Sequence, residues 1–204
     1  MNTESAVSLI LAALALGVSV VTAWLTLLRR GDLKMTRPAL VFFGFDPSTT
    51  PSAKVYLRML LYCSAARGRM VETLWLRVRT GQAEMILSRW AYGERSDLSP
   101  GSGLFVGQDG VTLNHHFLPV KGSAILAFSA GVYTIEVLAT TAGRHRAIVL
   151  GEMSLTLAED HAAALKDPLN GVFFHWLPEE NRYEASLDTR RSDATLFGAR
   201  RGLT

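Results

Sequence analysis

Two adjacent histidines, His115 and His116, are the residues of this chain best suited to acid–base or metal chemistry. They fall in a run that predicts a β-strand over 111–118, and neighbouring side chains on a strand point to opposite faces of the sheet. In regular strand geometry the two imidazoles therefore cannot bind one metal ion. The ligand spacings typical of zinc sites are also missing from the sequence. We expect neither a metal site nor a cofactor.

The other residues that could act in catalysis stand in unsuitable surroundings. Ser102 lies in PGSGL, which lacks the G-x-S-x-G pattern of a nucleophile elbow. The adjacent carboxylates at 159–160 and 179–180 fall at an expected helix start and in an expected turn, where the helix dipole or solvent accounts for them. The sequence predicts a protein that is not an enzyme, with a hydrolase using region 93–116 as an alternative.

An uncharged N-terminal run is the element on which the position of all other residues depends. It comprises the 24 residues from Ser5 to Leu28, and a helix of that length is about 36 Å long, enough to cross a hydrocarbon core of about 30 Å. This predicts a transmembrane helix over 5–28. Two interpretations compete with it, a cleaved secretory signal and a buried helix. A signal would begin with basic residues and have a shorter apolar run, whereas this chain begins MNTES.

Basic residues follow the apolar run and none precedes it. Arg29, Arg30, Lys34 and Arg37 lie in segment 29–38, which we interpret as a juxtamembrane linker that binds membrane lipid. Lys and Arg next to a spanning helix remain on the cytoplasmic side. The sequence thus predicts a single-pass protein of the inner (cytoplasmic) membrane, with residues 1–4 outside and the globular domain in the cytoplasm.

Small or hydroxyl-bearing residues recur along one side of the predicted helix. They are Ser8, Ala12, Ala15, Ser19, Thr22 and Thr26. Their steps of three and four residues keep them on one face, and small residues allow two helices to approach closely in lipid. We expect this face to pack against a partner helix, the alternative being a stripe formed by chance.

Length and composition indicate one globular domain after the helix. The chain has 204 residues and a formal net charge of +3 from 21 basic and 18 acidic residues. Such an even balance is not typical of a nucleic-acid-binding protein, whose basic residues cluster on one face. The single cysteine, Cys63, excludes an internal disulfide and lies in an apolar run that predicts a buried thiol.

From residue 39 onward, short apolar stretches alternate with turn signals, which is typical of an all-β sandwich or barrel. The first expected strands cover 39–45, 54–63, 70–79 and 82–92. Thr80-Gly81 predicts a tight hairpin between the last two, and Asp109-Gly110 predicts another between 104–108 and 111–118. Within the third strand, one face should carry Met70, Leu74, Leu76 and Val78, and the other Val71, Thr73, Trp75 and Arg77.

Residues 130–139 (AGVYTIEVLA) combine a glycine, a tyrosine and alternating apolar residues. This stretch resembles the penultimate strand of immunoglobulin-like and fibronectin-type β-sandwiches. In such folds a tyrosine corner fixes the start of the strand by bonding to the upstream backbone. The resemblance implies that role for Tyr133, and it implies an architecture and not a function.

The C-terminal part predicts additions to a minimal sandwich. Strand 146–157 should be followed by a short helix over 158–167 and a hairpin formed by GVFFHWL and RYEASLD. We therefore expect a transmembrane helix and an immunoglobulin-like β-sandwich over 39–188 with an appended helix and hairpin. Residues 189–204 predict a flexible basic tail.

The functional prediction is a non-catalytic interaction or accessory subunit of a membrane assembly, with a protein partner and no nucleic acid. It rests on the anchor, its small-residue face and the missing catalytic set. The alternative is an exported, membrane-tethered module that binds carbohydrate or lipid on aromatic residues such as Trp75, Trp90 or Trp176. That alternative requires the opposite topology.

Overall fold

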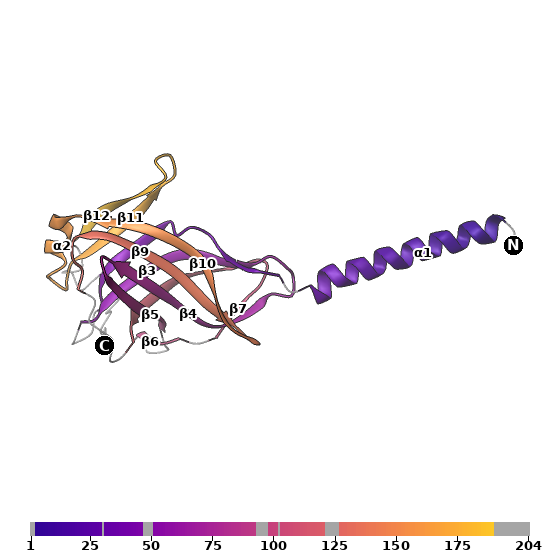
Figure 1. Cartoon of the computed structure of the whole chain (residues 1–204), viewed down its shortest axis with the longest axis horizontal. Helices are drawn as coiled ribbons and strands as arrows, with labels where there is room; N and C mark the ends of the chain where they lie inside the picture. The colour runs from indigo at the N-terminus through magenta and orange to yellow at the C-terminus, as the bar shows by residue number, and fades with distance from the viewer. Residues whose placement is uncertain are drawn as a thin grey trace, which may run out of the picture.

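The computed structural model describes residues 3–29, 31–46, 51–92, 98–101, 103–120 and 127–189. A long helix, α1 (Thr3–Ala23), projects from one end of a β domain (Figure 1). It continues as a π-helical turn, η1 (Trp24–Leu28), in which Arg29 N donates to Trp24 O at 2.8 Å. Residues 1–2 of the expected external segment lie outside the described residues.

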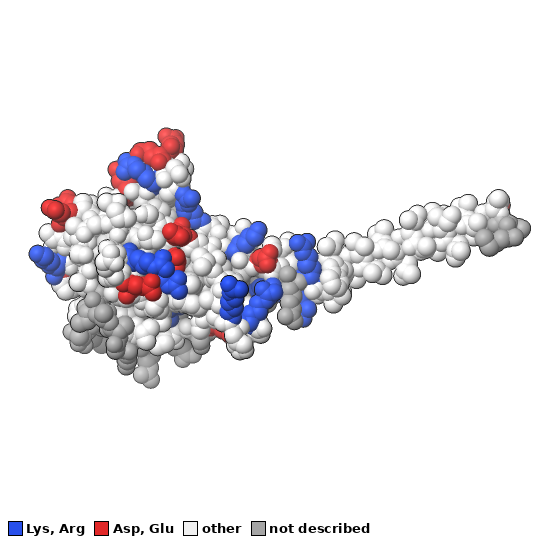
Figure 2. Space-filling model, in the orientation of Figure 1, with Lys and Arg blue, Asp and Glu red and all other residues white. Residues whose placement is uncertain are grey.

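Helix α1 buries none of its residues. Together with η1 it spans Thr3–Leu28, and it is the one helix in the described ranges that is long and apolar enough to cross a membrane. Its surface is nearly free of charged side chains, whereas Lys and Arg gather where it meets the domain (Figure 2). These features suit a membrane anchor or a secretory signal.

The β domain is one antiparallel sheet, with strands β1 (Leu33–Met35), β2 (Leu40–Phe45), β3 (Ala53–Cys63), β4 (Arg69–Thr80), β5 (Ala83–Tyr92), β6 (Leu98–Pro100), β7 (Leu104–Val106), β8 (Val111–Pro119), β9 (Gly131–Thr141), β10 (Arg144–Leu157), β11 (Gly171–Leu177) and β12 (Arg182–Asp188). Nine of them follow the order β10-β9-β4-β5-β8-β3-β2-β11-β12. The short strands β1, β6 and β7 pair with β3, β5 and β4 outside that order.

The sheet curls into a half-barrel around its own core, and the predicted two-sheet sandwich is not confirmed. Its strands are joined by hydrogen bonds in one continuous order, whereas a sandwich needs two sheets that face each other without such bonds. Several strands are long, up to the 14 residues of β10. Long twisted strands in a large sheet coil, which lets one sheet enclose its apolar face.

Alternating residues of the long strands fill the half-barrel. On β3, for example, Val55, Leu57 and Leu61 are completely buried. Rings stack within this core, as where Phe43 meets Phe174 with ring centroids 5.0 Å apart. The short helix α2 (Glu159–Ala164) lies at the end of the domain far from α1 (Figure 1), and Leu165, just after it, is part of the core.

Tyr133 bonds back to the backbone upstream, which is the contact that a tyrosine corner makes. Its hydroxyl donates to Ser129 O at 2.7 Å and accepts a hydrogen bond from Ser129 N at 2.9 Å. The side chain is fully buried at the start of β9. A corner of this kind therefore operates here inside a half-barrel and does not by itself define an immunoglobulin-like fold.

The hairpin expected at Asp109-Gly110 does not form as a strand pair. Gly110 has a φ of +77° and its N–H bonds to Gly107 O, so the turn is present. However, β7 pairs with β4, and β8 pairs with β3 and β5. Asp109 and Gly110 thus determine the turn between β7 and β8. The burial of the apolar faces of the long strands determines which strands pair.

Two other local expectations differ from the structure. Part of the predicted linker 29–38 forms β1, which pairs with β3. In β4, a register shift between Val71 and Thr73 places Val71 in the core and leaves Met70 46% exposed. An extra residue in a strand reverses the alternation of its side chains, which explains why Met70 points outward. The hairpins β4–β5 and β11–β12 form as predicted.

Candidate functional site

The two edge strands of the half-barrel, β10 and β12, face each other across a seam. Among the described residues, β10 pairs only with β9, and β12 only with β11. Neighbours in the nine-strand order are all antiparallel, so its first and last strands run in the same direction. Direct pairing would make them the one parallel pair in the sheet. One further strand, antiparallel to both, would complete an all-antiparallel barrel of even strand number.

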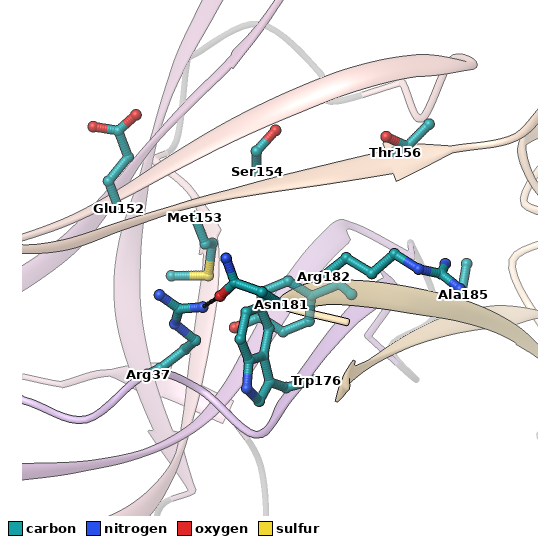
Figure 3. Close-up of a pocket in the computed structure, with 10 residues that line it drawn as sticks. Arg37, Glu152, Met153, Ser154, Thr156, Trp176, Asn181, Arg182 and Ala185 are labelled. Carbon is teal, nitrogen blue, oxygen red and sulfur yellow. Dashed lines mark hydrogen bonds between the residues drawn. The ribbon is translucent and has the colours of Figure 1, made fainter. Parts of the chain in front are cut away.

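A cleft of about 570 Å³ lies along this seam, within the size range of ligand-binding pockets. Figure 3 shows its two sides, β10 on one and the β11–β12 hairpin with Arg37 on the other. The lining residues are Arg37, Glu152, Met153, Ser154, Thr156, Trp176, Asn181, Arg182, Tyr183 and Ala185. The walls are thus mostly polar, and apolar side chains lie toward the core.

Arg37 is held in the cleft by two contacts with β11 and its turn. Its guanidinium carbon lies 3.9 Å from the ring centroid of Trp176, and its Nη1 donates to Asn181 Oδ1 at 3.0 Å. Asn181 has a φ of +50° in the turn before β12, a conformation that asparagine tolerates better than most residues. The turn residue and the cation therefore fix each other at the mouth of the cleft.

Tyr183 also lines the cleft. Its hydroxyl donates to Pro38 O at 2.7 Å, and its ring meets Trp176 at a centroid distance of 5.0 Å. Burial raises the pKa of Tyr183 to about 12, with nearby Arg37 opposing the shift. The phenol is thus protonated at neutral pH and acts as a hydrogen-bond donor that ties β12 to the chain after β1.

Met35 packs against the end of the seam nearest α1. A Cβ placed on Gly151 would lie 3.2 Å from the sulfur of Met35, so the side chain of β1 rests on the backbone of β10. Gly151 follows a register shift in β10 at Val149. A bulge at this point bends the edge strand, and the glycine allows Met35 to approach.

The two histidines singled out by the sequence are both buried and lie outside the cleft. His115 is 1% exposed and His116 is 8% exposed. Burial lowers the pKa of both to about 4, with the charges of Arg89 and Lys54 respectively adding to the effect. Across the described ranges, no three His, Cys, Asp or Glu side chains are grouped to hold a metal ion. Ser102 lies outside the described residues.

The predicted aromatic platform is divided between different parts of the sheet. Trp176 is in β11 and lines the cleft, whereas Trp75 is in β4 and Trp90 in β5. In the strand order, β5, β8, β3 and β2 separate β4 from β11. The structure therefore does not bring the three indoles onto one surface.

The predicted juxtamembrane residues separate into two groups. Arg29, directly after η1, and Lys34, in β1, are exposed, whereas Arg37 lines the cleft. Arg30 lies outside the described residues. The sequence analysis placed Arg37 in the linker because it follows Arg29, Arg30 and Lys34 closely in the chain. No spacing between residues in the sequence connects Arg37 with Trp176.

Hydroxyls on the expected helix-packing face bond within their own helix. Ser19 Oγ donates to Ala15 O at 2.9 Å, and Thr26 Oγ1 donates to Thr22 O at 2.8 Å. Thr22 does the same with Val18 O. Ser8, Ala12 and Ala15 lie in the same exposed helix. The hydroxyl protons of Ser19, Thr22 and Thr26 are thus used within the helix. At these three positions the face offers a second helix close packing and not a hydrogen-bond donor.

No family model, no curated protein and no solved structure matches this chain.

Proposed function

We propose that this protein is a non-catalytic, membrane-anchored interaction subunit whose seam binds an extended segment of a partner protein. The observation that carries the proposal is the parallel direction of the two edge strands across an open cleft. An inserted strand antiparallel to both would pair with both edges. Strand addition to exposed sheet edges is a common mode of peptide recognition.

The residues that line the cleft support a particular chemistry for the proposed occupant. Side chains on one face of the inserted strand would point toward Met153 and Ala185, which pack on or in the core. The other face would point toward solvent, between Glu152 and the cations of Arg37 and Arg182. The expected partner segment therefore alternates small apolar residues with polar ones. Strands β10 and β12 contact each other over part of their length. The segment would therefore enter where these two strands are apart, beside the turn of the β11–β12 hairpin.

Site-specific photo-crosslinking in intact cells tests this proposal. A photoreactive residue at Ser154, exposed on β10, should form an adduct with one protein whose crosslinked residues lie in a segment of alternating polarity. The matched control is Thr112, exposed on β8 away from the seam. Equal adducts at Ser154 and Thr112, or adducts at Ser154 only to residues within helices, would contradict strand addition.

The anchor and its orientation are part of the same proposal. We propose that Thr3–Leu28 spans the inner membrane with the domain in the cytoplasm, supported by the apolar helix and the basic residues that follow it. A fluorescent reporter that folds only in the cytoplasm, fused after Thr204, should be bright and membrane-bound. An alkaline phosphatase fusion at the same site should be inactive. Active phosphatase, or a mature chain that begins after Leu28, would contradict the proposed location.

A further inference from the structure

The end of the domain nearest α1 carries a surface that combines exposed apolar and basic side chains. Phe105 is 56% exposed and Met70 is 46% exposed, and the two are paired across β7 and β4. Lys and Arg side chains gather at this end of the domain (Figure 2). We define the membrane-facing rim as Arg67, Met70, Phe105, Arg144 and Arg146.

Hydrogen bonds fix the rim close to the end of the anchor. Gly31 is only three residues after Leu28, and its carbonyl accepts a buried hydrogen bond from Arg69 Nε at 2.7 Å. Asp32 and Ser64 bond to each other twice, through Asp32 N to Ser64 Oγ and Ser64 N to Asp32 O. Three residues extend at most about 10 Å. Gly31 in turn contacts Ala65, so loop 64–69 begins close to the helix end.

The apolar pair belongs to the same junction. A Cβ placed on Gly68, in this loop, would lie 2.6 Å from the ring of Phe105, so the ring rests on the loop backbone. Ala142 N donates to Met70 O at 2.9 Å, which places the β9–β10 turn beside Met70. Arg144 and Arg146 follow that turn directly. The contacts thus run from the anchor through loop 64–69 to Phe105, Met70 and the basic turn.

We infer that the membrane-facing rim docks on the anionic surface of the bilayer in which α1 sits, with Phe105 and Met70 at the headgroup level. This inference rests on the proposed membrane anchor. The headgroup layer of a bilayer extends several ångströms beyond its hydrocarbon core, which matches the short connection between Leu28 and Gly31. Basic residues near an anionic leaflet are attracted to its surface. Three acidic residues, Asp32, Glu72 and Asp109, also lie at this end. They are outnumbered by the exposed basic residues Arg29, Lys34, Arg67, Arg144 and Arg146.

Docking would orient the whole domain with respect to the membrane. The hairpin β11–β12 projects away from the β domain (Figure 1), and the cleft lined by Arg37 lies beside it (Figure 3). With the rim held on lipid, this mouth is presented at a fixed height above the bilayer. The rim therefore restricts which segment of a partner in the same membrane can reach the seam.

Collisional quenching in vesicles tests the inference with the full chain. An environment-sensitive fluorophore is attached to the cysteine of the Phe105→Cys variant, and the matched control is Val132→Cys. Val132 is similarly exposed, at 54%, and lies at the start of β9, at the opposite end of that strand from the rim. The native Cys63 is fully buried, and the parent protein checks that it is not labelled. The vesicles contain nitroxide-labelled phospholipid, with or without anionic lipid.

The expected result is strong quenching at position 105, at least threefold above position 132, in anionic vesicles. Replacing Arg67, Arg144 and Arg146 with Gln, or removing the anionic lipid, should reduce it at least twofold. Equal quenching at 105 and 132, while the protein still floats with the vesicles after alkaline washing, would overturn the docking inference and leave the anchor intact. Loss of the protein from the vesicles on washing would instead overturn the proposed anchor.

Discussion

The buried His115 should make the domain sensitive to acid. Its side chain is 1% exposed, and within the described part of the chain neither Nδ1 nor Nε2 has a hydrogen-bond partner. Burial lowers the pKa of His115 to about 4, and the positive charges of Arg89 and His116 add to this effect. The imidazole is thus held neutral in the folded protein at a pH where the unfolded chain takes up a proton.

The sign and size of the effect follow from these pKa values. Between the unfolded value of 6.5 and the folded value of about 4, the unfolded state binds a proton that the folded state does not, so stability falls as the pH falls. Each pKa unit corresponds to about 1.4 kcal/mol, which gives His115 a total loss of about 3 kcal/mol below pH 4. The pKa of His116 is lowered in the same direction, chiefly by burial.

The variant His115→Leu isolates this contribution. It removes the proton-binding group and, in the described residues, breaks no hydrogen bond, so its stability at pH 7.5 should equal or slightly exceed that of the parent. On acidification to pH 4.5 it should lose about 2 to 3 kcal/mol less than the parent. Urea unfolding of the full chain in nonionic detergent, followed by tryptophan fluorescence, measures both differences. The exposed His145→Leu is the control, which should keep the full acid loss.

The comparison cancels the titration of carboxylates, since parent and variant share them. If His115→Leu and the parent lost the same free energy of unfolding between pH 7.5 and 4.5, the imidazole would not be held neutral by its surroundings. The assignment of His115 as an unpartnered core residue would then be wrong. A loss of stability in the variant at pH 7.5 that exceeds the cost of repacking a core side chain, about 1 to 3 kcal/mol, would equally contradict it.

Three further substitutions test separate parts of the fold. Tyr133→Phe removes both bonds with the Ser129 backbone and should cost about 1 to 3 kcal/mol of unfolding free energy, measured by urea titration; an unchanged midpoint would show that the corner is dispensable. Glu136→Gln weakens the ion pairs of Glu136 with Arg77 at 2.7 Å and Arg79 at 3.0 Å, with a cost of about 1 kcal/mol that should shrink in 1 M salt; a cost independent of salt would argue against a charge network. Gly31→Ala would place a Cβ 2.3 Å from Ala65 N, so it should lower the thermal midpoint by several degrees and reduce lipid quenching at position 105. The control Gly17→Ala, whose added Cβ would meet no atom within 4 Å, should change neither quantity.

The sequence was informative where the physical cause is local. The apolar helix is visible because 24 successive residues carry no charge, and β3, β4 and β9 are visible because their buried faces alternate along the chain. The hairpins at Thr80-Gly81 and before Arg182 follow from turn chemistry. Even the backbone bond of Tyr133 was suggested by the residues around it.

The arrangement of those strands was not accessible in the same way. Strand β3 lies between β2 and β8, and β4 lies between β5 and β9. The residue pattern within a strand does not indicate which other strands pair with it. A sandwich and a half-barrel both require alternating strands, so the alternation could not separate them. The bulge that turns Met70 outward likewise depends on the register with β9.

The cleft was missed because its residues converge only in three dimensions. Arg37 and Trp176 are far apart in sequence. The sequence placed Arg37 in a basic linker and grouped Trp176 with Trp75 and Trp90 as a possible aromatic platform. Glu152 and Ser154 are ordinary outward-facing strand residues. Their place in the proposed binding site follows only from the strand order. Strand β10 is at one end of a nine-strand order, and an odd number of antiparallel strands leaves the two end strands parallel.

The most direct test of the account is hydrogen exchange of the full chain with and without a synthetic peptide copied from the segment that crosslinks to Ser154. The account predicts that amides of β10 and β12 exchange more slowly with the peptide bound, while those of the central strands β8 and β3 are unchanged. Protection confined to another surface, or unchanged exchange in both β10 and β12 at saturating peptide, would contradict the claim that the seam accepts an additional strand.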